Sequence, residues 1–162
     1  MEDMDQIYRQ YMMQIYKYLF SLCHDSHLTE ELTQETFYQA LKYIDTFRGD
    51  CKLYVWLCQI AKRLWIKEVR KRKKENKVEL VEEIPVQDQL IDEGIILRGE
   101  KMDLYKLMHS LPEPTREVMH LRLSGEFSFK EIGEIMGKDE NWARVTFYRG
   151  KQKIREEKKN EM

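Results

Sequence analysis

Hydrophobic positions along most of the chain recur every three or four residues, which is the repeat of an amphipathic α-helix rather than of a strand. In the first half this repeat predicts three helices, at residues 3–23, 26–45 and 51–75, with Ser26 as the cap of the second. Gly49 is the only glycine in the first 93 residues, and the first proline is Pro85. A multi-stranded sheet needs more turn residues than that, so we expect an all-helical protein.

The helical pattern breaks down near the middle of the chain, between about residues 76 and 94, and resumes in a helix that ends near residue 110. A proline-containing corner at residues 111–114 then precedes a helix that ends near residues 124–125. The expected organisation is two small helical domains, at residues 1–77 and 99–162, joined by a flexible linker at residues 78–98.

The last forty residues predict a helix-turn-helix. Ser128 and Glu131 have the spacing of a capping box, and Gly137 suits the left-handed position that ends the helix they open. Asp139 can cap a final helix at about residues 140–157. Gly133 is unfavourable inside a helix unless another segment approaches closely, as in a helix-turn-helix. A generic helical hairpin shares most of these features and stays open as an alternative.

The final helix has its apolar and small residues on one face and its polar and basic residues mostly on the other. The positions that we expect to point inward are Ala143, Phe147, Gly150 and Ile154. The candidate DNA-binding residues on the other side are Asn141, Trp142, Arg144, Val145, Tyr148, Arg149 and Lys151. In a recognition helix the N-terminal outward residues read base edges, whereas basic residues further along contact phosphates. For Trp142, packing against the turn and contact with DNA are equally open.

Charge is segregated although the chain as a whole carries only −1. Residues 1–36 carry −5 and residues 78–100 carry −6, whereas residues 60–77 carry +7 and residues 138–159 carry +4. Two basic segments separated by an acidic one suggest two places where a polyanion docks, although solvated helix faces would give the same counts.

The sequence gives little support for a membrane protein, a metal protein or an enzyme. The chain has no apolar run long enough for a membrane span and begins with an acidic segment, so we expect a cytoplasmic protein. A metal site would have to use Cys23, His24, His27, Cys51 and Cys58, which lack metal-ligand spacing, and we expect no metal. Neither a phosphate-cradling glycine loop nor a nucleophile elbow occurs, so we expect no enzymatic activity, no small-molecule substrate and no cofactor.

Ordered motifs give the chain a family resemblance. Three segments look like the first domain of small bacterial sigma factors: Glu31–Phe37, Phe47–Asp50 and Trp56–Arg63. Three more resemble their C-terminal domain: Leu111–Leu123, Phe129–Gly133 and Trp142–Lys151. The order, the spacing and the intervening linker resemble the extracytoplasmic-function (group IV) sigma factors over essentially the whole chain.

The resemblance implies a dissociable specificity subunit of bacterial RNA polymerase. Its N-terminal domain would bind and help melt the −10 promoter element, and its C-terminal domain would read the −35 element. The face that resembles the family's docking surface for core polymerase consists of Glu31, Gln34, Glu35 and Tyr38. The resemblance also implies an anti-sigma factor, often membrane-bound in this family, as a further partner.

The resemblance also assigns the −10 contacts. The loop that captures a flipped base in this family corresponds to Phe47, Arg48, Gly49 and Asp50, followed by Cys51. The residues suited to backbone and base-edge contacts along the third helix are Lys62, Arg63, Lys67 and Arg70, with Arg63 at the family's specificity position. The ring of Phe47 can stack on a base or close the loop as a core residue, and we favour the second role. Trp56 and Trp65 are interpreted as core residues.

Two departures and one alternative remain. Many relatives carry a basic residue where this chain has Thr146, and the start of the last helix is not their commonest one, so the −35 bases that are read stay open. A stand-alone helix-turn-helix regulator is the alternative function. Such a regulator would need only the C-terminal domain and would leave the basic third helix and the Phe47–Asp50 loop unexplained.

Overall fold

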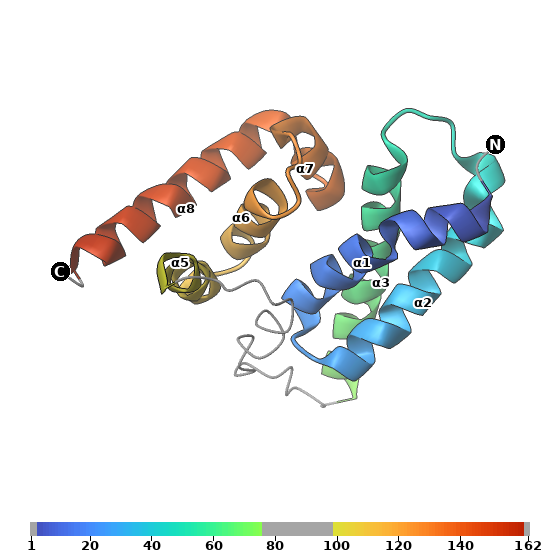
Figure 1. Ribbon diagram of the computed structural model, residues 1–162, viewed down its shortest axis with the longest axis horizontal. Helices are drawn as coiled ribbons and strands as arrows, with labels where there is room; N and C mark the ends of the chain where they lie inside the picture. Colours follow the sequence, from blue (N-terminus) through green and yellow to red (C-terminus); the bar gives the residue numbers. More distant parts are fainter. Residues whose placement is uncertain (1–2, 76–98, 161–162) are drawn as a thin grey trace. The chain divides into compact units, whose positions relative to one another are not determined.

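The computed structural model describes residues 3–75 and 99–160, and all regular structure within these ranges is helical. The chain divides into two compact units. The first holds α1, α2, the 3₁₀ helix η1 and α3, and the second holds α5, α6, α8 and the start of α7 (Figure 1). The all-helical prediction is confirmed. The predicted linker at residues 78–98 lies outside the described residues.

Helix α1 (Met4–Cys23) leads into helix α2 (Ser26–Tyr43) through a two-residue corner. His24 ends α1 in the left-handed conformation, with φ of 55°. The Asp25 carboxylate then accepts hydrogen bonds from the backbone N–H groups of His27 and Leu28, at 3.0 and 3.3 Å. The prediction of Ser26 as the cap is therefore wrong by one residue, because Asp25 holds the extended conformation of a cap and Ser26 is already helical.

Helix α3 (Leu53–Lys74) completes the first unit, in which α1, α2 and α3 contact one another pairwise. Between α2 and α3 lie η1 (Ile44–Thr46), which replaces the predicted last turn of α2, and a loop. The apolar side chains buried in this unit are Ile7, Ile15, Tyr18, Leu19, Phe20, Cys23, Leu28, Leu32, Phe37, Ala40, Val55, Leu57, Cys58, Ile60 and Ala61.

Three buried threonines shape the inner face of α2. Thr29, Thr33 and Thr36 each donate their hydroxyl hydrogen to the carbonyl oxygen four residues earlier, at 2.7 Å. These bonds satisfy the hydroxyl donors inside the helix, so the polar side chains can be buried at low cost. The buried face of α2 consists of Leu28, Thr29, Leu32, Thr33, Thr36, Phe37 and Ala40. The apolar repeat along this helix predicts that Leu41 also points inward, but its side chain is 57% exposed.

The second unit consists of α5 (Gly99–Ser110), α6 (Thr115–Leu123), α7 (Phe129–Met136) and α8 (Glu140–Asn160). Helix α6 packs on both α5 and α8, and α5 also contacts α8. Arg116 fastens the corner between α5 and α6, since its Nε donates to Glu113 Oε1 at 2.7 Å and its Nη1 donates to the His109 carbonyl at 3.1 Å. The side chains buried here include Leu107, Met108, Leu111, Val118, Met119, Leu121, Phe127, Ile132 and Ile135.

The helix-turn-helix formed by α7 and α8 has the predicted caps. Ser128 N–H donates to Glu131 Oε1 at 2.9 Å, and Glu131 N–H donates to Ser128 Oγ at 3.1 Å, which completes the capping box. Asp139 Oδ1 accepts from Trp142 N–H at 2.6 Å. Gly137 ends α7 with φ of 70°. A Cβ atom on Gly133 would lie 2.7 Å from the Lys138 carbonyl oxygen, so this glycine permits the close turn.

Candidate nucleic-acid and polymerase interfaces

Helix α8 buries one narrow stripe and leaves most of its other residues exposed. The predicted inward residues Ala143, Phe147, Gly150 and Ile154 are all buried. The exposed candidate DNA-binding residues are Asn141, Arg144, Val145, Tyr148, Arg149 and Lys151. Trp142 is half-buried, and the Lys138 ammonium lies 5.7 Å from the centre of its ring. The Trp142 ring therefore packs on the turn yet keeps accessible surface.

A group of aromatic and cationic side chains surrounds Phe129 at the start of α7, and we call it the Phe129 cluster: Arg122, Phe129, Arg144, Phe147 and Tyr148. The guanidinium groups of Arg122 and Arg144 lie over the Phe129 ring, 4.2 and 5.3 Å from its centre. The same ring lies 5.6 Å from the ring of Phe147 and 6.0 Å from that of Tyr148. The cluster joins three helices at the exposed side of α8.

Sequence reasoning missed the contribution of α6 and α7 to this surface. The sequence gives Arg122 no separate role and marks Phe129 only as part of the family motif and of the capping segment. One feature of the sequence does point to Phe129: it is an aromatic residue that directly follows the cap Ser128 and begins α7, the helix that precedes α8. Nothing in the linear pattern, however, places Arg122 on that ring.

Helix α3 exposes a second cationic surface. Residues Arg63, Lys67, Arg70 and Lys74 are exposed and follow one another at intervals of four, three and four residues, so they share one face, which we call the α3 stripe. Lys62, also predicted to contact DNA, is half-buried beside the stripe. From Arg63 to Lys74 the stripe covers twelve residues and spans about 16 Å of helix, which is enough to follow several phosphates.

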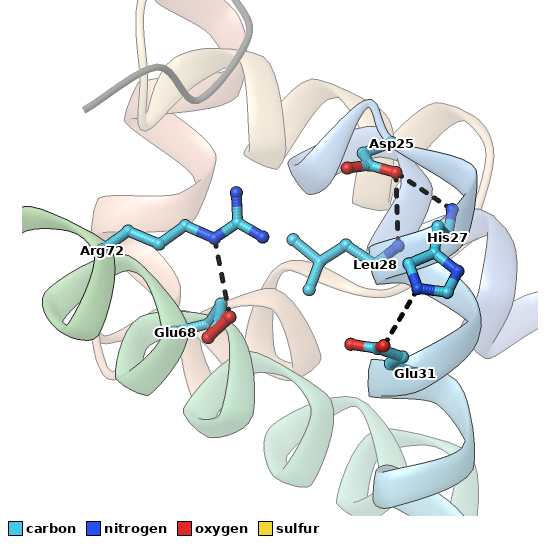
Figure 2. A network of polar contacts seen from close by, with 6 residues as sticks. All are labelled: Asp25, His27, Leu28, Glu31, Glu68 and Arg72. Carbon is cyan, nitrogen blue, oxygen red and sulfur yellow. Dashed lines mark hydrogen bonds and ion pairs between the residues drawn. The ribbon is translucent and has the colours of Figure 1, made fainter. Parts of the chain in front are cut away.

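The basic end of α3 contains one residue with a structural role. Arg72 Nε lies 3.5 Å from Glu68 Oε1, and both side chains are mostly buried, at 28% and 21% exposure. Figure 2 shows Arg72 extending from α3 toward Leu28 and Asp25 at the start of α2. Burial raises the pKa of the nearby Cys23 thiol to about 12, with Arg72 and Glu68 among the charges that act on it. The almost wholly basic end of α3 predicts a helix end that protrudes past the core, yet the Arg72 side chain at this end is only 28% exposed.

The loop between η1 and α3 presents polar residues around one packed ring. The Phe47 ring is half-buried and lies 5.1 Å from the ring of Trp56. Arg48, Gly49 and Asp50 are exposed. Gly49 has φ of 77°, a conformation that side chains disfavour, and it leaves open space around its Cα. This geometry fits the favoured interpretation of Phe47 as the residue that closes the loop.

The outer face of α2 carries an acidic and amide surface. Glu31, Gln34 and Tyr38 are exposed. Glu35 is half-buried and accepts a hydrogen bond from Gln39 Nε2 at 2.9 Å. His27 Nε2 lies 3.1 Å from Glu31 Oε1 (Figure 2). The structure therefore brings the four predicted polymerase-binding residues onto one side of a single helix.

Comparison with known proteins decides the family. The model of Sigma-70 region 2 matches residues 7–75, and that of Sigma-70 region 4 matches residues 101–154. The sigma factor SigM of Bacillus subtilis, of the extracytoplasmic-function class, is 30% identical over 159 residues, which cover 93% of this chain and 92% of SigM. The chain belongs to the extracytoplasmic-function sigma factors of RNA polymerase.

Further relatives and solved structures agree. The B. subtilis sigma factor YlaC is 28% identical over 157 residues, covering 95% of this sigma factor and 91% of YlaC. The fold resembles RpoE of Bartonella quintana, solved with the anti-sigma factor NepR, with a TM-score of 0.72, 21% identity and 96% coverage of both chains. It also resembles CnrH, solved with the cytosolic domain of CnrY, with a TM-score of 0.67, 15% identity and coverage of 98% and 89%.

Membership of the family argues against the alternative function. A stand-alone helix-turn-helix regulator is not favoured, because residues 7–75 match a sigma-factor domain that such a regulator would not need. Among the residues that the structure describes, no group of three or more His, Cys, Asp or Glu side chains gathers as a metal site would require. In that same part of the sigma factor, no helix combines the length and apolar character of a membrane span.

Proposed function

We propose that this sigma factor divides promoter recognition between its two domains, taken as residues 1–77 and 99–162 with a linker at residues 78–98. The N-terminal domain would bind core RNA polymerase and the −10 element, and the C-terminal domain would bind the −35 element. The observation that carries the proposal is the presence of one exposed cationic surface in each unit, the α3 stripe in the first and the outer face of α8 in the second.

The polymerase-binding face in this proposal is the outer side of α2. Glu31, Gln34, Glu35 and Tyr38 supply carboxylate, amide and phenol groups there, and the helix is already folded and capped. A preformed surface loses little conformational freedom on binding. Its acidic side chains would steer association with a basic partner surface.

The −10 element would be held by the loop and by the α3 stripe. Arg48, Gly49 and Asp50 are exposed around the packed Phe47 ring and would hold an unpaired base through polar and backbone groups. Arg63, Lys67 and Arg70 would follow the phosphates of the opened strand, with Lys62 at the edge of this surface.

The −35 element would be read by α8 in the major groove. Arg144 near the start of the helix offers a fork of donors that suits the acceptor pair of a guanine. Asn141, Trp142, Val145 and Tyr148 lie on the same exposed part of α8. Arg149 and Lys151 are further along and would contact phosphates, which position the helix without reading the sequence.

The proposal also includes the cellular location of this sigma factor and a further protein partner. This sigma factor would act in the cytoplasm, and the chemistry of transcription would belong to the polymerase, with no catalytic residue or cofactor of its own. Because the structural relatives RpoE and CnrH were solved with NepR and with a cytosolic domain of CnrY, we include an anti-sigma factor as a partner that controls its availability.

Reconstitution with core polymerase tests the proposal. The purified chain should allow the core enzyme to start transcription at a defined set of genomic promoters, and sequencing of the run-off transcripts should reveal two spaced upstream motifs. Core enzyme alone is the control. Start sites that do not change when the chain is added would refute the proposed function.

A further inference from the structure

We infer that Phe129 and Arg122, which lie outside the recognition helix, help to set promoter specificity because they fix the position of Arg144. This inference rests on the proposed reading of the −35 element by α8. It assigns two positioning residues that act on the base-reading side chain rather than on DNA bases: Phe129 contacts Arg144, and Arg122 contacts Phe129.

The contacts on Arg144 come from two sides. Its guanidinium lies 5.3 Å from the centre of the Phe129 ring. Its Nη2 also lies 2.9 Å from Glu140 Oε2, one turn earlier in α8. The Arg144 side chain remains 45% exposed, so it is held without being covered. A long cationic side chain in this state is oriented before DNA arrives and loses less rotamer freedom when it binds.

Arg122 fixes the ring on which Arg144 rests. Arg122 Nη1 donates to the Phe127 carbonyl oxygen at 2.9 Å, and the guanidinium lies 4.2 Å from the centre of the Phe129 ring. The side chain is half-buried and anchored to the backbone, so it is not available to move onto DNA. Through its contact with the ring, Arg122 holds Phe129 in the place where Arg144 meets it.

The chemistry of the ring matters beyond its volume. The face of an aromatic ring carries partial negative charge and attracts a guanidinium, whereas an aliphatic side chain of similar size does not. Phe129 is half-buried rather than fully enclosed, so its position tolerates other large side chains. A leucine would fill much of the space but would not orient Arg144, and a tyrosine would keep the aromatic face.

The experiment measures base preference with holoenzyme. Variants F129L, F129Y and R122Q would each be combined with core polymerase on promoters that differ by single base pairs in the upstream element. The control is R116A, which removes an arginine that is bonded to Glu113 and His109 away from the cluster. Thermal unfolding of each variant separates loss of fold from change of preference.

The expected result is a change in preference that follows the ring and its anchor. F129L and R122Q should reduce discrimination by about two- to five-fold at the base pairs where R144A also changes it. F129Y and R116A should retain the wild-type preference. In an R144A background, F129L should change the preference no further, because the side chain that the ring positions is already absent.

Three outcomes would overturn the inference. One is an equal loss of activity by F129L on every promoter, which is what a purely structural role would give. Another is wild-type preference in both F129L and R122Q. A wild-type holoenzyme that does not discriminate among upstream sequences would instead refute the proposed −35 function, and this inference with it.

Discussion

Neighbouring basic residues on α3 have different environments, and their roles follow from their contacts rather than from their charge. Arg70 is exposed on the α3 stripe, whereas Arg72 pairs with Glu68 and is largely covered. Both belong to the same run of basic residues in the sequence. Only the helical geometry shows that the first faces solvent and the second faces the start of α2.

We expect R70A and R72A to separate DNA binding from stability. R70A removes an exposed charge, so it should weaken promoter binding at all sequences and reduce the slope of log affinity against log salt by about 1. R72A leaves Glu68 partly buried without its partner and should lower the free energy of unfolding by about 1 kcal/mol. Salt-dependent binding of holoenzyme and urea unfolding measure the two effects. Equal salt slopes for R70A and wild type would contradict the assignment.

The cysteines should differ in reactivity according to their environment. Burial raises the pKa of Cys23 to about 12, so its reactive thiolate is scarce in the folded protein at pH 8. Because the neutral thiol is favoured in the fold, its stabilising effect is complete below the ordinary thiol pKa and is lost as pH rises toward 12. Iodoacetamide labelling followed by mass spectrometry should modify the half-buried Cys51 before Cys23. Urea should abolish this order, and equal labelling rates in the folded protein would argue against it.

At the scale of the elements, two glycines inside helices, Gly133 in α7 and Gly150 in α8, have different neighbours. A Cβ at Gly133 would meet backbone atoms of Lys138 and Asp139 at 2.7–2.9 Å, and at Gly150 it would meet side-chain atoms of Thr115 and Met119 at 2.8–3.2 Å. Side chains can move aside more readily than backbone. G133A should therefore lower the free energy of unfolding by roughly 1–3 kcal/mol, and G150A should lower it less, since alanine also favours the helix. Thermal unfolding of both variants tests the order, and a larger loss in G150A would contradict it.

The outer side of α2 allows a test of the proposed polymerase-binding face without disturbing the core. We expect the double variant Q34A/E35A to lose binding to core polymerase while its thermal unfolding stays close to that of wild type. The matched control is Q10A/Q14A, which removes two exposed residues from α1. A pull-down with core polymerase measures the difference. If Q34A/E35A is retained on the polymerase as well as the control, the docking assignment is wrong.

The elements were largely predictable from sequence, whereas contacts between them were not. The spacing of apolar residues and the caps at Ser128, Asp139 and Gly137 located α7 and α8, because helix ends depend on nearby residues. The exposure of Leu41 was missed because buried threonines, which count as polar in a periodicity, occupy the inner face of α2. The Phe129 cluster was missed for a different reason. It depends on how α6, α7 and α8 pack against one another, and the periodicity of apolar residues does not show which helices pack together.

At the scale of the whole molecule, each of the two units offers only a limited cationic surface, and this limits the affinity for DNA. Each surface alone makes few contacts, so the isolated sigma factor should bind promoter duplex weakly. When core polymerase holds both units, the second contact becomes intramolecular, and affinity should rise by a factor on the order of 100 or more.

Fluorescence anisotropy with and without core polymerase measures this gain. The control is a duplex with both promoter elements scrambled, for which the gain should be much smaller. Equal affinity of the isolated chain and the holoenzyme for the promoter would contradict the prediction and would support binding by the isolated chain.

The buried threonines of α2 have a consequence for evolution. Because each hydroxyl proton is bonded to a carbonyl oxygen of α2 or of its cap residue Asp25, it needs no polar acceptor on α1 or α3. An aliphatic residue beside these threonines can then be replaced by another aliphatic residue, and no threonine hydroxyl loses its hydrogen-bond acceptor. The interior of this domain can therefore drift from one species to another while its architecture persists, which accords with relatives that share less than a third of their residues with this chain.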